Sequence, residues 1–420
     1  MSAMPSAPEP GRVDHGRPPA MQVQQSSAGV VSSAADPYSL APGLLRLPPA
    51  TCGLALGLCG LGSLLRTLAS DVGGLPLPGD FLCWLMLGIV APIITIFSLR
   101  IGLNPSAALA EALDVRIAPA YGAYSMTLMY LSAWPVGALS SAGGLALLYA
   151  ASTLATAVQL TYLAQHLSAA AYKRNQISLA PSCFPATVSC GLVPIIGAEL
   201  HMSTAVRDVA FVLGFLVASC LTPIAIRNLV ASAKHAASAE VWPLTAPWAL
   251  LSVAWFVSDG GTRTPRGLGT VLPSISIAMF ALTLAFAIRR RRAIARTFFA
   301  PAWVMFTFPS CTTSVSMLHM ARRYPALRGA VLTISACTVL VVASTSILFA
   351  CKLPTWIMDH QRARFLSSST TASEEATSGR TQVYDAGDGA KETTGSHCVA
   401  LEAVPGKQCE PESQGGGLRV

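Results

Sequence analysis

Ten apolar stretches of about 20 residues each, with cores free of charged side chains, occupy most of the chain between residues 48 and 352. A stretch of this length crosses the hydrocarbon core of a bilayer as one α-helix, because a helix satisfies its own backbone hydrogen bonds. We therefore expect an all-α integral membrane protein with ten transmembrane helices. The expected spans are approximately 48–69, 81–100, 118–139, 143–167, 180–200, 208–230, 243–258, 268–288, 300–321 and 329–352.

The composition argues against a large soluble core. Only 11% of the 420 residues are charged, whereas soluble domains have about 25%. The net charge of +8 comes from basic residues in loops beside the apolar stretches, a pattern typical of topology determinants and not of nucleic-acid binding. The eleven cysteines show no paired spacing, and no CxxC or HExxH motif is present, so we expect no metal site and no cofactor. No nucleophile, base and orienting group can be named, which argues against an enzyme.

Two polar tails flank the apolar region. Residues 1–40 and 361–420 lack apolar runs and are expected to be disordered cytoplasmic tails around a transport domain at 41–360. A cytoplasmic N-terminus places most basic loop residues on the cytoplasmic side, including the run from Arg289 to Arg292. Ten spans return the chain to its starting side, so both termini are expected in the cytoplasm. We expect the plasma membrane rather than an organelle membrane.

Prolines recur in the odd-numbered spans, which begin about 60–70 residues apart. A proline removes a backbone hydrogen bond, and irregular backbone within a membrane is tolerated only where protein or water surrounds it. We therefore expect five helical hairpins, in which five proline-bent inner helices surround a central pore and straighter helices lie outside. The expected bends are at Pro119, Pro194, Pro247 and Pro309.

The polar groups of the inner spans are hydroxyls and small residues. Hydroxyls solvate an anion weakly enough to release it, although any single one is more typical of helix packing. Proton and cation paths usually place an acid within the membrane, and the span cores contain none. The pattern favours an uncharged pore for small anions. Candidate lining residues are Thr127, Thr187, Ser189, Gly191, Ser252, Thr307 and Thr312.

One stretch of the ninth span places two phenylalanines before a proline. The stretch Ala302 to Pro309, AWVMFTFP, resembles the ninth-helix pattern of the tellurite-resistance/dicarboxylate transporter family, in which Phe-Pro follows Ala-Trp-Trp, two residues and Thr or Ser. This family includes bacterial tellurite-resistance channels, plant slow-type anion channels, and yeast malate and sulfite carriers. Weaker similarities follow in consistent order at 47–66, 114–124, 159–168, 186–200 and 245–255.

The resemblance implies a homotrimer in a lipid bilayer, with ten helices and one pore per subunit. It also implies that the phenylalanine before the proline, Phe308, closes the pore, with Phe306 as the second candidate. An apolar ring at a helix bend makes a dewetting constriction, which agrees with that role. The chain departs from the family pattern in having Gly191 where plant channels have a second phenylalanine. It is therefore interpreted as a divergent member.

Three functions stay open at this point. The first is passive or weakly coupled passage of small anions through the gated pore. The second is a proton-coupled carrier of malate, other C4-dicarboxylates or sulfite, for which Arg116 is a possible attractor, but the lack of a buried carboxylate argues against proton coupling. The third is a membrane scaffold or receptor that transports nothing and acts through its tails.

Overall fold

The computed structural model describes residue 49 and residues 51–72, 79–114, 117–167, 181–231, 238–257, 267–289, 305–352 and 355. All of them belong to the first of two compact units, Met1–Ile357; the second unit is Met358–Val420. The regular elements in these ranges are helical, without a strand. The prediction of an all-α protein is thus confirmed for the described part of the chain. The predicted tails, 1–40 and 361–420, lie outside it.

Six of the described helices are long and apolar enough to cross a membrane. In the first helix, 67% of the residues in its apolar 18-residue stretch are buried, whereas in the other five helices only 22–33% are buried. Apolar helices that expose most of their side chains suit a lipid environment. The chain is therefore an integral, multi-pass membrane protein. The six helices are α1 (Thr51–Val72), α2 (Gly79–Leu103), α6 (Ser141–Leu167), α10 (Thr204–Ala231), α13 (Leu268–Arg289) and the span Pro325–Lys352.

Four segments between these helices are interrupted, and they are mostly buried except at their ends. They coincide with the third, fifth, seventh and ninth stretches expected from the sequence. Their elements are α4 (Ala118–Leu131), the π-helical turn η2 (Ser132–Val136), α5 (Gly137–Leu139), η3 (Pro181–Cys183), α8 (Phe184–Thr187), η4 (Ser189–Leu192), α9 (Val193–Glu199), η5 (Ser238–Thr245), α11 (Ala246–Val257) and α15 (Thr307–Arg323).

Prolines stand at most of these interruptions. Pro194 and Pro247 lie in the first turns of α9 and α11, each directly after a 3-10 segment, and Pro309 is the third residue of α15. Pro119 also lies in the first turn of its helix, but α4 follows a turn at Ile117 and not a 3-10 segment, so Pro119 starts the helix rather than bending the segment. The interruption of that segment falls instead at η2, which contains Pro135.

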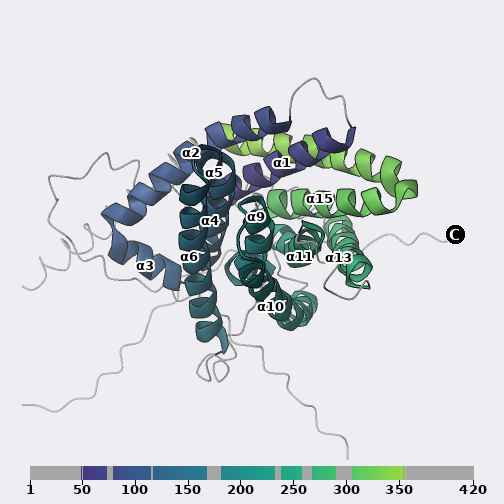
Figure 1. The fold of residues 1–420 in the computed structure, drawn as a ribbon. Helices are drawn as coiled ribbons and strands as arrows, with labels where there is room; N and C mark the ends of the chain where they lie inside the picture. Colours follow the sequence, from purple (N-terminus) through teal and green to yellow (C-terminus); the bar gives the residue numbers. More distant parts are fainter. Residues whose placement is uncertain are drawn as a thin grey trace, which may run out of the picture. The chain divides into compact units, whose positions relative to one another are not determined.

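The buried segments contact one another in a closed cycle, which we call the inner ring. In this ring α1 packs against α4, α4 against α8 and η4, η4 and α9 against α11, and α11 against α15. The helix α15 then packs back against α1, and Figure 1 shows it between α1 and α11. Because α1 and α15 close this cycle, side chains from distant parts of the sequence meet inside it.

Each exposed helix packs against the buried segment that precedes it in the sequence. Thus α2 packs against α1, α6 against α4, α10 against α9, and α13 against α11. The last span, Pro325–Lys352, is tied to α15 by a hydrogen bond from Ser314 Oγ to Thr338 Oγ1, 3.0 Å long. The short helix α3 (Pro105–Leu113), which the sequence analysis did not predict, connects α2 to α4.

Candidate functional site

Phe308 lies where three segments of the inner ring meet. It is the second residue of α15, and its side chain is 5% exposed. A Cβ added to Gly60 of α1 would stand 3.0 Å from its Cδ2 atom. Its ring also meets the ring of Tyr130 of α4 edge-on, with 6.4 Å between the centroids. Since α1 lies between α15 and α4 in the ring, the side chain of Phe308 reaches into the interior.

Phe306, the second gate candidate, lies at a different interface. Its ring meets that of Trp242 in η5, with 5.2 Å between centroids. Trp242 in turn packs against Phe280 of the exposed helix α13, with 6.2 Å between centroids. Phe306 therefore joins the inner ring to an outer helix, whereas Phe308 joins inner segments to one another.

Three of the predicted lining hydroxyls donate to carbonyls of their own helix. Thr127 Oγ1 donates to the carbonyl of Ala123 over 2.8 Å, and Thr187 Oγ1 to that of Cys183 over 3.3 Å. Thr312 Oγ1 lies 3.1 Å from the carbonyl oxygen of Phe308. A hydroxyl solvates an anion through its proton, so each of these groups must rotate away from its carbonyl to do so.

Two further predicted lining residues hold helices together. Ser252 of α11 accepts a hydrogen bond from Ser316 of α15 at 2.7 Å. Thr307 packs so tightly against α1 that a Cβ on Gly57 would stand 2.0 Å from its Oγ1 atom. Both residues lie at contacts between neighbouring segments of the inner ring.

The remaining two predicted lining residues belong to the 181–199 segment. The Oγ atom of Ser189 is buried and has no hydrogen-bond partner within the described residues, so its proton is available to a ligand. Gly191 faces the neighbouring helices: a Cβ on Gly214 of α10 would stand 3.4 Å from its Cα atom, and its own Cβ would stand 3.8 Å from Leu250 of α11.

The sequence analysis missed a row of hydroxyls on α1. Ser63, Thr67 and Ser70 follow Gly60 at spacings of three and four residues, which places all four on one side of the helix. Because Gly60 meets Phe308, this side looks into the inner ring. Ser63 and Thr67 remain partly exposed although α1 is the most buried of the six long helices. The spacing was visible in the sequence, but the direction of the row was not.

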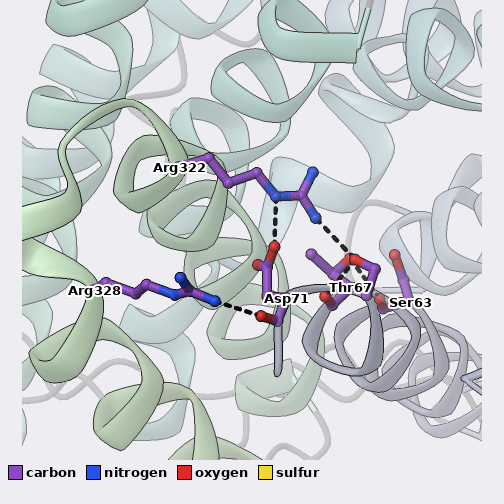
Figure 2. Close-up of polar contacts among 6 residues, drawn as sticks. Ser63, Thr67, Asp71, Arg322 and Arg328 are labelled. Atoms are coloured by element: carbon purple, nitrogen blue, oxygen red, sulfur yellow. Dashed lines mark hydrogen bonds and ion pairs between the residues drawn. The ribbon is translucent and has the colours of Figure 1, made fainter. Parts of the chain in front are cut away.

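The hydroxyl row ends at a group of charged side chains, shown in Figure 2. Arg322 Nε donates to Asp71 Oδ1 at 2.7 Å. Arg322 Nη2 donates to Ser70 Oγ at 2.9 Å. Arg328 Nη2 donates to the backbone carbonyl of Asp71 at 2.6 Å. We call this place the Asp71 end. It joins α1, α15 and the span Pro325–Lys352.

One side of α1 thus contacts one side of α15 at two places. Phe308 and Arg322 are about four turns apart on α15, which puts them on nearly the same side. They meet α1 at Gly60 and at Ser70, respectively. Between these two contacts, the hydroxyls of α1 face the side of α15 that carries Phe308. The hydroxyl row of α1 is thus bordered by an aromatic ring at one end and by arginines at the other.

The family model of voltage-dependent anion channels matches residues 46–353. The chain belongs to this family. The match includes all six long helices and the whole inner ring, and it confirms the resemblance seen at the AWVMFTFP stretch. A comparison with curated proteins finds no significant match. As a member of the voltage-dependent anion channel family, the protein is a membrane transport protein for anions, with lipid and anions as its partners.

This anion channel family member also carries a polar cluster at the opposite end of its bundle, where α2 ends. Arg100 of α2 forms an ion pair with Glu111 of α3, and the hydroxyl of Tyr121 in α4 donates to the other oxygen of Glu111 at 2.9 Å. These contacts fasten α3 to the inner ring. Within the described residues, no group of three or more His, Cys, Asp or Glu side chains is placed to hold a metal ion.

Proposed function

We propose that this protein passes small anions through a pore inside the inner ring, and that Phe308 gates the pore. The proposed architecture is ten transmembrane helices in five hairpins, with the interrupted segments inside and the straighter helices outside. The observation that carries the proposal is the position of Phe308, which spans from α15 past Gly60 to Tyr130. A gate that closes a pore has to contact more than one of the helices that form it.

The physical basis of closure is dewetting. Phe308 and Tyr130 are both at most 5% exposed, and Gly60 has no side chain that could offer a polar group. The apolar ring of Phe308 fills this space and excludes an ion, because the ion cannot keep its hydration shell beside the ring. Movement of the Phe308 ring away from Gly60 connects the hydroxyl row of α1 with the other side of the constriction.

The charge pattern supports an anion channel over a proton-coupled carrier of malate, other C4-dicarboxylates or sulfite. Coupling to protons generally requires an acid that titrates within the membrane. Near Phe308, the described stretches 51–65, 118–139, 182–198 and 305–321 contain no Asp, Glu, Lys or Arg. Hydroxyls offer donors to an anion without a fixed charge that would trap it, and Ser189 Oγ has no hydrogen-bond partner among the described residues.

We also propose the orientation and assembly that the sequence favours. Both termini lie in the cytoplasm, which places the Asp71 end outside the cell and the Arg100 end inside. The plasma membrane is the proposed location, and a homotrimer with one pore per subunit is the proposed assembly. The orientation rests on the positive-inside bias, which includes the run from Arg289 to Arg292. The trimer rests on the family resemblance.

The test is anion flux in proteoliposomes that contain the full chain or its Phe308→Ala variant. Chloride, nitrate, sulfite and malate are compared with and without a pH gradient. We expect Phe308→Ala to raise the flux of at least one inorganic anion at least about tenfold without a gradient, since removal of the ring removes the dewetting barrier. Phe306→Ala is the matched control and should not raise it.

Two outcomes would contradict the proposal. Unchanged flux of every anion through a folded Phe308→Ala variant would remove Phe308 as the gate. Malate or sulfite uptake that occurs only with a proton gradient would identify a coupled carrier instead. A scaffold or receptor that transports nothing would show no flux in either protein.

A further inference from the structure

We propose that the Asp71 end holds an anion-binding site that loads the pore. The site is the cavity bordered by Ser70, Asp71, Arg322 and Arg328, and its ligand is a small inorganic anion such as chloride or nitrate. This inference rests on the proposed function, because a loading site requires a pore to load. It adds a second point of anion contact, about four helical turns from Phe308.

The cavity is large enough for an anion with part of its hydration shell. Its volume is about 330 Å³, whereas a water molecule occupies about 30 Å³ in the liquid. Its lining combines polar and charged side chains with apolar ones. The lining residues are Ser70, Asp71, Leu318, Ala321, Arg322, Pro325, Arg328 and Leu332.

The charges of the cavity favour an anion. Two guanidinium groups face one carboxylate, so the site carries one net positive charge. The exposure of the two ion-pair partners is unequal: the Arg322 side chain is 45% exposed, and that of Asp71 is 14% exposed. An arriving ion therefore meets guanidinium donors before it meets the carboxylate. Guanidinium groups stay protonated at any physiological pH and present several N–H donors to an anion.

Asp71 has two roles in this arrangement. Its carboxylate and its backbone carbonyl each accept a hydrogen bond from one of the two arginines, so the residue holds both guanidinium groups at the cavity. It also offsets one of the two positive charges. A site that bound an anion too tightly would block conduction, so partial neutralisation keeps the ion exchangeable.

The cavity also borders the hydroxyl row of α1. Ser70, which accepts a hydrogen bond from Arg322, is the last hydroxyl of the row that begins with Ser63 near Phe308. An anion held by Arg322 is therefore next to one end of this row, and the other end of the row approaches the proposed gate. Charge at the mouth of a channel raises the local concentration of the permeating ion, and this effect is greatest when the bulk concentration is low.

The experiment measures conductance against anion concentration in lipid bilayers, with every variant placed in the open Phe308→Ala background. We expect Arg322→Gln to raise the half-saturating chloride concentration about 3- to 10-fold, at the low end of the enhancement that charged clefts produce. The effect should appear when chloride is varied on the Asp71 side and not on the other side. Arg322→Lys keeps the charge and should retain most of the affinity.

The matched control is Arg323→Gln. Arg323 is the next residue of α15, but it points away from the cavity: a Cβ on Gly269 of α13 would stand 3.0 Å from its Nη1 atom. Both changes remove one positive charge from the same helix turn. An equal effect of Arg322→Gln and Arg323→Gln would overturn the proposed site, because it would show that both arginines act through the general surface potential.

A substitution with the opposite expected effect on the half-saturating concentration distinguishes loss of the site from misfolding. Asp71→Asn leaves both arginines and removes the opposing charge, so the half-saturating concentration should fall while the maximal conductance also falls. If Asp71→Asn and Arg322→Gln shift the half-saturating concentration in the same direction, the site is overturned. If Phe308→Ala itself does not conduct, the proposed function fails, which is a distinct result.

A lipid phosphate offers the same chemistry as a free anion, so the bilayer composition has to be varied. We expect the effect of Arg322→Gln to be the same in bilayers of phosphatidylcholine alone and in bilayers that include phosphatidylglycerol. An effect that is present only with the anionic lipid would show that the cavity holds a headgroup, and it would overturn the loading site.

Discussion

The ring of Phe308 meets the ring of Tyr130 edge-on, with 6.4 Å between their centroids, although α15 and α4 are separated by α1 in the inner ring. Edge-to-face aromatic pairs of this kind contribute about 0.5–1.5 kcal/mol beyond the area they bury. The pair therefore stabilises the position in which Phe308 crosses the interior. This contribution is small enough for thermal motion or a modest stimulus to reverse it.

Tyr130→Ala is expected to open the pore in part. Loss of the partner ring removes the edge-on contact, so Phe308 occupies its crossing position for less of the time. The anion flux should lie between those of the wild type and Phe308→Ala, as measured in proteoliposomes. Tyr130→Phe keeps the ring and should behave as the wild type. Flux through Tyr130→Ala no greater than that of the wild type would show that Tyr130 does not hold the gate.

Gly57→Ala should weaken the contact between α1 and α15. The added Cβ would stand 2.0 Å from Thr307 Oγ1, so one of the two helices has to shift. We expect a loss of about 1–3 kcal/mol of unfolding free energy, typical of overpacking. Thermal unfolding in detergent measures it.

Gly88→Ala is the control for this prediction. Gly88 lies in α2, and a Cβ added there meets no atom of the described residues within 4 Å. The substitution should leave the unfolding temperature unchanged or raise it slightly, because alanine has the higher helix propensity. Equal destabilisation by the two substitutions would contradict the tight packing at Gly57.

Phe306→Ala should destabilise the protein without opening it. The side chain packs against Trp242 and is 7% exposed, so its truncation leaves a cavity between η5 and α15. The expected loss is about 3–5 kcal/mol, as for other buried phenylalanines. The measurement combines thermal unfolding with anion flux in the same preparation. A stable variant with raised flux would move the gate from Phe308 to Phe306.

The hydrogen bond between Ser316 and Ser252 should be measurable as a coupling between α15 and α11. Hydrogen bonds between membrane helices contribute about 0.6 kcal/mol on average in double-mutant cycles. We expect a coupling of that size from Ser316→Ala, Ser252→Ala and the double variant, measured by unfolding in detergent. Strict additivity of the two single changes would mean that the 2.7 Å contact adds no stability of its own.

The exposed helices were predictable because a lipid-facing helix has to be long, apolar and continuous. This requirement makes α2, α6, α10, α13 and the span Pro325–Lys352 visible in the sequence, with boundaries close to those observed. The inner segments were also found, but their interruptions were predicted less well. Pro135, not Pro119, lies at the break of the third segment. A proline at a helix start and one inside a helix look alike in a sequence.

The roles of the hydroxyls were equally hard to predict from the sequence. The sequence identified which spans are rich in Ser and Thr, but a hydroxyl that bonds to a neighbouring helix, as Ser252 does, cannot be told from one that stays partly exposed, as Ser63 does. The distinction depends on the rotation of each helix about its own axis. That rotation is set by contacts such as Gly57 against Thr307 and Gly60 against Phe308, which join residues far apart in the chain.

The sequence by itself determined that this protein is a helical membrane protein and that it resembles the anion-transporting family to which it belongs, because hydrophobic length and a short motif are local properties. Only the tertiary structure decided that Arg322 meets Ser70 and Asp71, and that Phe308 rather than Phe306 reaches Tyr130. These contacts require α1, α4 and α15 to meet in one ring. No local pattern encodes a meeting between residues that are more than 170 positions apart in the chain.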